Sequence, residues 1–160
     1  MALKPDRSFE SFYEVGFFVN SVAEAGGIVC GPSGLGTPGS GAAMDNANQV
    51  AEYATSASGR YALGVLCNTF VNKDLTQQTL NPYKSERQIG DKATIINKGW
   101  VTTNMLVDGF SANVVPGQPV YLGASGKLTT NSVWPQYGMQ VGRIMSKADQ
   151  EGYVKVRIDL

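Results

Sequence analysis

The chain contains no histidine among its 160 residues. This absence excludes Ser-His-Asp and Cys-His nucleophile arrangements, histidine proton shuttles and most catalytic zinc sites, because each of them needs an imidazole. A carboxylate pair such as Asp91 with Asp108 would remain, but nothing in the sequence places the two together, and aspartates beside turns are common for local reasons. We therefore predict that the protein is not an enzyme and that it uses no cofactor or metal.

Charge is also sparse. Only 16% of the residues are charged, and 13 basic side chains balance 13 acidic ones. A balanced chain is a poor match for partners that are captured by bulk charge, so we expect neither nucleic acid nor a membrane as a partner. Charged residues interrupt the first ten positions, and no apolar run is long enough to cross a bilayer. We therefore expect neither a signal peptide nor a transmembrane segment.

Cysteine is nearly absent. The two cysteines, Cys30 and Cys67, stand alone without CxxC spacing. This pattern favours two reduced, buried thiols over a disulfide, although a disulfide stays open as the alternative.

What the chain has in abundance is glycine, with 19 residues. Two glycine-framed runs resemble one another: GDKATIINKGWVTTN, which starts at Gly90, and GQPVYLGASGKLTTN, which starts at Gly117. Each has a β-type run, a turn that ends in glycine, and a Thr-Thr-Asn strand. The pattern predicts two hairpins, with tight turns at 97–99 and 124–126. Chance similarity is the alternative to duplication, and it would leave both hairpins in place.

Further strand signals surround these hairpins. Short β-type pieces are expected at 15–19 and 28–30, joined by a turn at Gly26-Gly27, and a buried strand at 61–71. The run from Tyr137 resembles that strand, since Val141-Gly142 matches Leu63-Gly64. The last strand, 153–160, alternates apolar and charged residues and should bury one face. Met105–Val115 is expected to continue as a strand.

The remaining segments suggest at most one or two short helices. The best helix candidate is 42–58, part of which could also be extended. Residues 31–41 contain a formal GxGxxG match, but a proline stands where the phosphate-binding helix would begin, so we predict a surface loop that binds no nucleotide. Residues 72–88 are polar and predict an exposed excursion. Together the patterns predict a single all-β domain, a small antiparallel barrel or sandwich over 15–160.

Residues 1–14 are expected to form an extended N-terminal arm. The arm and the residues after it are unusually aromatic for a free tail, and these rings would either dock on a partner or fill the core of the domain itself. The polar loop 131–136 contains a tryptophan, which would likewise either pack on the core of the domain or contact a partner. We take seven of these residues as candidate contacts with a partner protein or with another subunit: Phe9, Phe12, Tyr13, Phe17, Phe18, Trp134 and Tyr137.

The second hairpin, GQPVYLGASGKLTT, and the closing run GMQVGRIMSKADQEGYVKVRIDL resemble the end of small phage capsid cement (head decoration) proteins. The resemblance covers roughly residues 61–160. It implies a β-tulip-like fold, a homotrimer, the major capsid protein as partner, and a virion location on the capsid surface after synthesis in the host cytoplasm. The alternative function is that of a carbohydrate- or ligand-binding β-module. The aromatic residues Trp100, Trp134 and Tyr137 favour this alternative.

Overall fold

The computed structural model describes residues 3–4, 12–14, 16–31, 50–75, 86–107, 114–132 and 138–160, and side chains are left aside at 3–4, 12 and 14. Strands dominate these residues; the helical element with described bounds is a 3-10 turn, η4, and Leu75 also has a 3-10 conformation. The all-β prediction is therefore confirmed. The strands are β1 (Leu3–Lys4), β2 (Phe12–Glu14), β3 (Ile28–Cys30), β4 (Ala62–Leu66), β5 (Thr69–Val71), β6 (Glu86–Gln88), β7 (Ile95–Thr103), β8 (Pro119–Leu122), β9 (Leu128–Thr129), β10 (Gln140–Ile144) and β11 (Val154–Asp159), with η4 at Ala124–Gly126.

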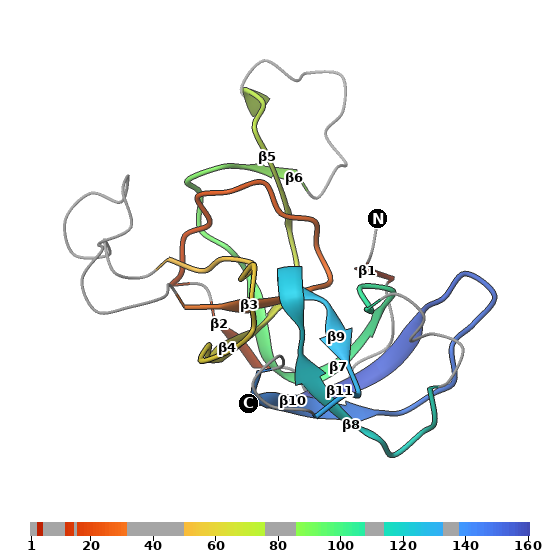
Figure 1. Cartoon of the computed structure of the whole chain (residues 1–160). Coiled ribbons are helices and arrows are strands. Elements are labelled where there is room, and N and C mark those ends of the chain that lie inside the picture. The colour runs from red at the N-terminus through yellow and green to blue at the C-terminus, as the bar shows by residue number, and fades with distance from the viewer. Residues whose placement is uncertain are drawn as a thin grey trace.

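The strands form one curled antiparallel sheet in the order β3-β4-β7-β11-β10-β8-β9, and β1 and β2 add to β7 (Figure 1). The sheet nearly closes into a barrel. The backbone of Leu128 in β9 exchanges hydrogen bonds with Met105 and Val107, which follow β7. A separate parallel pair, β5 with β6, extends away from the barrel. Closure of this kind leaves few free sheet edges.

The first predicted hairpin is wrong. Asn97, Lys98 and Gly99 do not form a turn, because β7 runs straight through them as a nine-residue strand. Its partners explain why: β11 pairs with Lys98–Thr103, while β4 and β2 pair with the first residues of the strand. Gly99 does adopt a positive φ of 144°, a backbone conformation that favours glycine. Pairing with the neighbouring strands nevertheless outweighs the local preference for a turn.

The second predicted hairpin is confirmed. β8 and β9 pair through Tyr121 with Thr129 and Leu122 with Leu128. The connection is η4, in which Ser125 and Gly126 have φ values of 56° and 72°. These left-handed conformations are the ones that the Ala-Ser-Gly sequence predicts for a tight connection.

Two hydrophobic clusters share the strands β3, β4 and β7. Ile28, Val65 and Ile96 point into the barrel core, whereas their chain neighbours Val29, Leu66 and Ile95 point into a second cluster around Phe70. These parts of the three strands are buried on both faces, which accounts for the short apolar runs at 28–30, 65–66 and 95–96. The final strand, β11, follows the predicted alternation: Val154, Val156 and Ile158 are fully buried, while Arg157 and Asp159 are exposed.

Two glycines explain the similarity between the 61–71 and 137–147 runs. A Cβ at Gly64 would lie 2.3 Å from the Ile96 carbonyl oxygen, and one at Gly142 would lie 1.9 Å from the Arg157 carbonyl oxygen. In both cases the backbone of the adjacent strand occupies the space of a side chain. The Leu-Gly and Val-Gly dipeptides thus mark equivalent close approaches between paired strands.

The half-buried phenol of Tyr53 joins two turns that are distant in the sequence. Its hydroxyl donates a hydrogen bond to the Glu24 carbonyl oxygen and accepts one from the Gly27 amide at 3.1 Å. Its ring fills the space beside Gly27 and Gly126, where a Cβ would come within 2.8 and 2.4 Å of ring atoms. The contact joins η4 to the turn before β3.

Other predictions are met in part. The described part of the predicted helix 42–58, residues 50–58, is not helical: Val50 and Glu52 form single bridges with Phe18 and Cys30 instead. The 61–71 run breaks at Cys67 and Asn68 into two strands, β4 and β5. The glycine-rich 32–41 segment and most of the 72–88 excursion lie outside the described residues, and the excursion ends in the strand β6.

Candidate interaction surfaces

The described residues contain no cluster of three or more cysteine, aspartate or glutamate side chains that could hold a metal ion. Nor do they include a helix that is long and apolar enough to cross a membrane.

Both cysteines have a free thiol. Cys30 is buried and Cys67 half-buried. Burial raises the pKa of the Cys30 thiol and raises that of Cys67 to about 11, because a thiolate would lose its hydration there. Since the thiolate is the reactive form, neither residue resembles a catalytic nucleophile.

The N-terminal segment lies along β7. β1 pairs Leu3 with Thr103 and Lys4 with Thr102, while β2 pairs Phe12 with Lys98, Tyr13 with Ile96 and Glu14 with Ile95. Backbone pairing of this kind holds the segment against the sheet without burying every side chain. Tyr13 is in fact 55% exposed.

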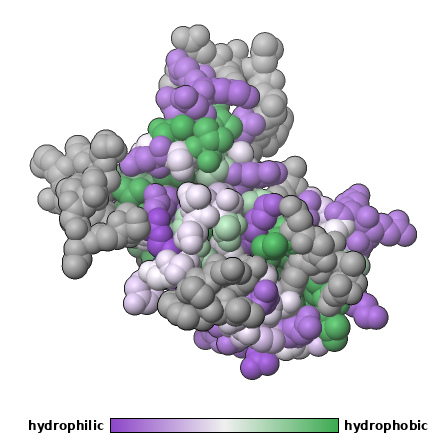
Figure 2. All heavy atoms as spheres, viewed as in Figure 1, coloured by the Kyte–Doolittle hydropathy of each residue, from purple (hydrophilic) through white to green (hydrophobic). Residues whose placement is uncertain are grey.

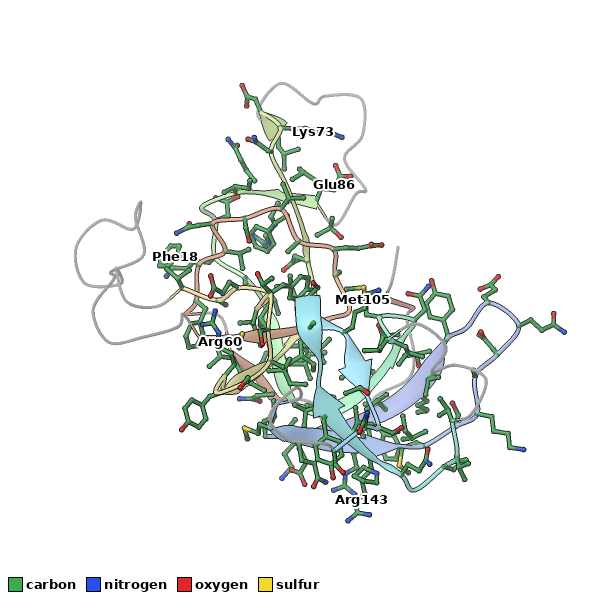
Figure 3. All side chains as sticks on the ribbon, in the orientation of Figure 1. Phe18, Arg60, Lys73, Glu86, Met105 and Arg143 are labelled. Atoms are coloured by element: carbon green, nitrogen blue, oxygen red, sulfur yellow. The ribbon has the colours of Figure 1, made fainter. Side chains whose placement is uncertain are left out.

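The structure separates the other predicted contact residues. Phe17 is half-buried and packs against the second hydrophobic cluster. Phe18, seen at the side of the molecule in Figure 3, is half-buried with the Lys92 ammonium 5.7 Å from its ring centre. Phe9, Trp134 and Tyr137 lie outside the described residues, and only the backbone of Phe12 is described. Of the seven residues, Tyr13 is thus the one whose described side chain is largely exposed.

The surface has an apolar hollow that the sequence did not predict. Its volume is ≈ 350 Å³, and it is lined by Gly59, Arg60, Tyr61, Gly138 and Met139. Tyr61 is 79% exposed and Met139 43% exposed, which is unusual for residues of this size beside one another. On the face shown in Figure 2, hydrophobic residues form separate patches bordered by hydrophilic ones, with one patch at the base of the β5–β6 pair.

Arg60 fixes one wall of this hollow. Its guanidinium forms an ion pair with Glu52 at 2.6 Å and donates a hydrogen bond to the Gly31 carbonyl oxygen at 2.9 Å. The sequence predicted Tyr61 as the start of a buried strand. Strand β4 begins one residue later, at Ala62, and buries its last three residues and not its first two, so Tyr61 lies ahead of the buried part of this run.

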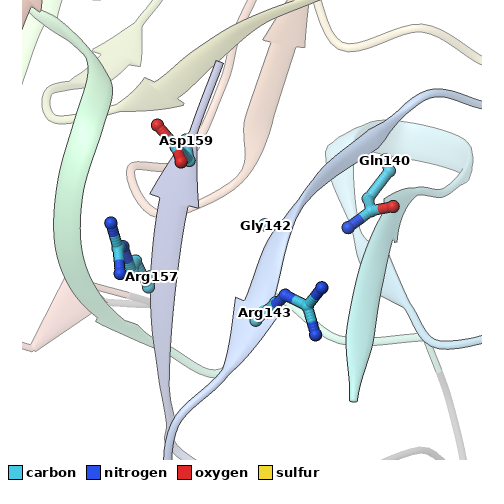
Figure 4. A pocket seen from close by; sticks show the side chains of 5 residues that line it. All are labelled: Gln140, Gly142, Arg143, Arg157 and Asp159. Atoms are coloured by element: carbon cyan, nitrogen blue, oxygen red, sulfur yellow. The ribbon is translucent and has the colours of Figure 1, made fainter. Parts of the chain in front are cut away.

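A second hollow lies on the outside of β10 and β11, with a volume of ≈ 470 Å³ and a lining of Gln140, Gly142, Arg143, Arg157 and Asp159 (Figure 4). Trp100 of β7 pairs directly with Arg157. The ammonium of Lys155 lies 5.3 Å from the centre of the Trp100 ring. A sugar-stacking platform needs an open ring face, and a cation already lies over this one.

No known protein family matches the sequence, and no curated protein does. A solved structure does match in fold: a chain of the structure titled "The capsid of Myoviridae Phage XM1" aligns over 94% of this chain and 84% of its own length, with a TM-score of 0.57 and 18% identity. The likeness shows that the two chains share a fold over nearly their whole length.

Proposed function

We propose that this chain is a structural virion protein, a cement or decoration protein that binds the outside of an assembled phage head and stabilises it. The observation that carries the proposal is the fold shared with a phage capsid structure over 94% of the chain. The resemblance of the closing hairpin and strands to cement proteins points the same way. The lack of histidine and the inert thiols add no competing chemistry.

The physical task of such a protein is to hold joints between shell subunits closed. A trimer that bridges several subunits adds buried area across joints that packaged DNA would otherwise force open. A modest affinity at each contact is multiplied when three contacts are made at once, because the second and third contacts are intramolecular. The protein therefore needs self-association and at least one shell-binding surface on each copy.

We assign the shell contact to the N-terminal arm and the aromatic residues Phe9, Phe12 and Tyr13. The exposure of Tyr13, 55% while its backbone is paired to β7, supports an arm that offers its side chains outward. Burying one such ring stabilises an interface by roughly 1.5–3 kcal/mol before ordering costs. The exposed Tyr61 and Met139 are assigned to contacts between copies of the chain.

A truncation tests the arm. Removing residues 1–11 deletes β1 and Phe9 but leaves β2 complete. Combined with Phe12→Ser and Tyr13→Ser, which remove the other two assigned rings, the truncated chain should keep its melting temperature within a few degrees and its sedimentation coefficient, yet lose binding to phage heads. A Tyr61→Ser variant is the matched comparison: it should weaken self-association and keep the arm. If the truncated chain melts far earlier, the arm belongs to the domain; if it binds heads normally, the attachment lies elsewhere.

A further inference from the structure

The outer face of β7, β10 and β11 carries an excess of positive charge. Its outward positions hold the four cations Lys98, Arg143, Lys155 and Arg157 and, among the described residues of these strands, the single carboxylate of Asp159. That carboxylate lies 3.7 Å from the Lys98 ammonium. Lys98 and Asp159 thus offset each other, which leaves the two arginines as the excess charge of this face. Since the whole chain has zero net charge, positive charge is concentrated locally on this face.

The two arginines occupy positions that stability alone does not favour. Arg143 of β10 and Arg157 of β11 are direct cross-strand partners, and like charges opposite one another weaken an antiparallel pair. Their guanidinium groups turn apart, that of Arg157 toward β7 and that of Arg143 toward β8 (Figure 4). Arg143 reaches the Gly117 carbonyl oxygen at 3.5 Å, a long hydrogen bond. The arrangement leaves space between the two groups.

That space is the ≈ 470 Å³ hollow. Gly142 contributes no side chain to it, and none could be added because a Cβ would collide with the Arg157 carbonyl oxygen. Gln140 and Asp159 complete the lining. A carboxylate that entered the hollow could accept paired hydrogen bonds from a guanidinium and one from the Gln140 amide. Relief of the Arg143–Arg157 repulsion would add to the attraction.

We propose that this face is a docking surface for an acidic segment of a partner protein, with carboxylates seated between Arg143 and Arg157. A nucleic-acid backbone fits less well, because phosphate recognition needs a row of cations, whereas the excess charge here is confined to two arginines on neighbouring strands, and because the chain has no net positive charge. Trp100, opposite Arg157 on the neighbouring strand, adds an aromatic side chain of a type that is enriched in protein contacts.

Trp100 also gives the experiment its signal. The chain has two tryptophans, so a Trp134→Phe variant leaves Trp100 as the sole tryptophan, which can be excited at wavelengths that tyrosine does not absorb. Titration of this variant with poly-L-glutamate at low salt should change the Trp100 fluorescence saturably, and rising salt should weaken the binding. In the same background, the pair Arg143→Gln and Arg157→Gln should lower the affinity at least about tenfold, as expected when charge-assisted hydrogen bonds are lost.

The matched control removes the same charge elsewhere. Lys73→Gln with Arg87→Gln alters exposed cations of the β5–β6 region, which lies at the opposite end of the molecule from Arg143 (Figure 3), and should change the affinity less than about twofold. If the glutamine pair does not fold, Arg143→Lys with Arg157→Lys keeps the charge and removes the paired geometry; it should still bind more weakly than the control. Three results would overturn the proposal: no saturable binding, equal loss in the control, or tighter binding of a single-stranded oligonucleotide of matched charge.

Discussion

Replacing Gly142 with alanine tests how closely β10 and β11 are paired. The added Cβ would lie 1.9 Å from the Arg157 carbonyl oxygen, 3.0 Å from the Arg157 carbonyl carbon and 3.2 Å from the Ile158 Cα. All three are backbone atoms of the neighbouring strand, so no side-chain rotation can relieve the clash. The two strands would have to separate by more than about 1 Å at this point to restore an ordinary C···O contact.

The cost follows from what that separation disrupts. Gly142, Arg143 and Ile144 pair with Ile158, Arg157 and Val156, and β11 in turn pairs with β7 over six positions. Overpacking costs typically about 1–3 kcal/mol, and each weakened ladder hydrogen bond costs about 1 kcal/mol more. We expect a loss of about 3 kcal/mol in the free energy of unfolding. For a chain of this size that lowers the melting temperature by about 6–12 °C.

Thermal unfolding followed by circular dichroism measures this effect. Gly31→Ala is the matched control, because nothing lies within 4 Å of a Cβ at Gly31, and it should change the free energy of unfolding by less than about 0.5 kcal/mol. Equal melting temperatures for wild type and Gly142→Ala would refute the close approach of the two strands. A comparable loss in both glycine variants would show instead that glycine itself, rather than the contact, is what matters.

Three further predictions concern other residues. Gly64→Ala should destabilise the chain at least as much as Gly142→Ala, because Gly64 combines a φ of 147° with a Cβ position 2.3 Å from the Ile96 carbonyl oxygen; a neutral result in urea unfolding would contradict this. Tyr53→Phe keeps the ring but removes the hydroxyl bonded to Gly27 and Glu24, and should cost about 1–3 kcal/mol of unfolding free energy. Cys67 has a pKa of about 11, so it should react slowly with thiol reagents at pH 8. Its reaction rate should rise about tenfold for each unit by which the pH is raised, up to that pKa. Rapid labelling in native buffer, or a disulfide with Cys30, would contradict this prediction.

The sequence was most informative where residue patterns repeat along a strand. The alternation of β11 and the Ala-Ser-Gly connection between β8 and β9 are local features, and the structure confirms both. The turn expected at Asn97–Gly99 failed because the neighbours of β7 come from four other strands distant in sequence. Pairing of that kind leaves no local trace, so a glycine in the middle of β7 was interpreted as a turn.

The candidate surfaces were less predictable than the fold. The aromatic segment around Tyr13 was evident from composition, but the packing of Phe17 against the second cluster depends on contacts with distant residues. The Arg143–Arg157 pair requires the register of β10 against β11, which the sequence of either strand alone does not give. Tyr61 and Met139 lie side by side only once the barrel closes.

Co-sedimentation with phage heads tests the central claim most directly. Purified full-length protein would be added to expanded heads that lack it, and the bound fraction measured as its concentration rises. The account predicts saturable binding, as a trimer, to the outside of the heads and a higher temperature for DNA release from the decorated heads. Protein that stays in the supernatant at every concentration, while remaining folded, would contradict it.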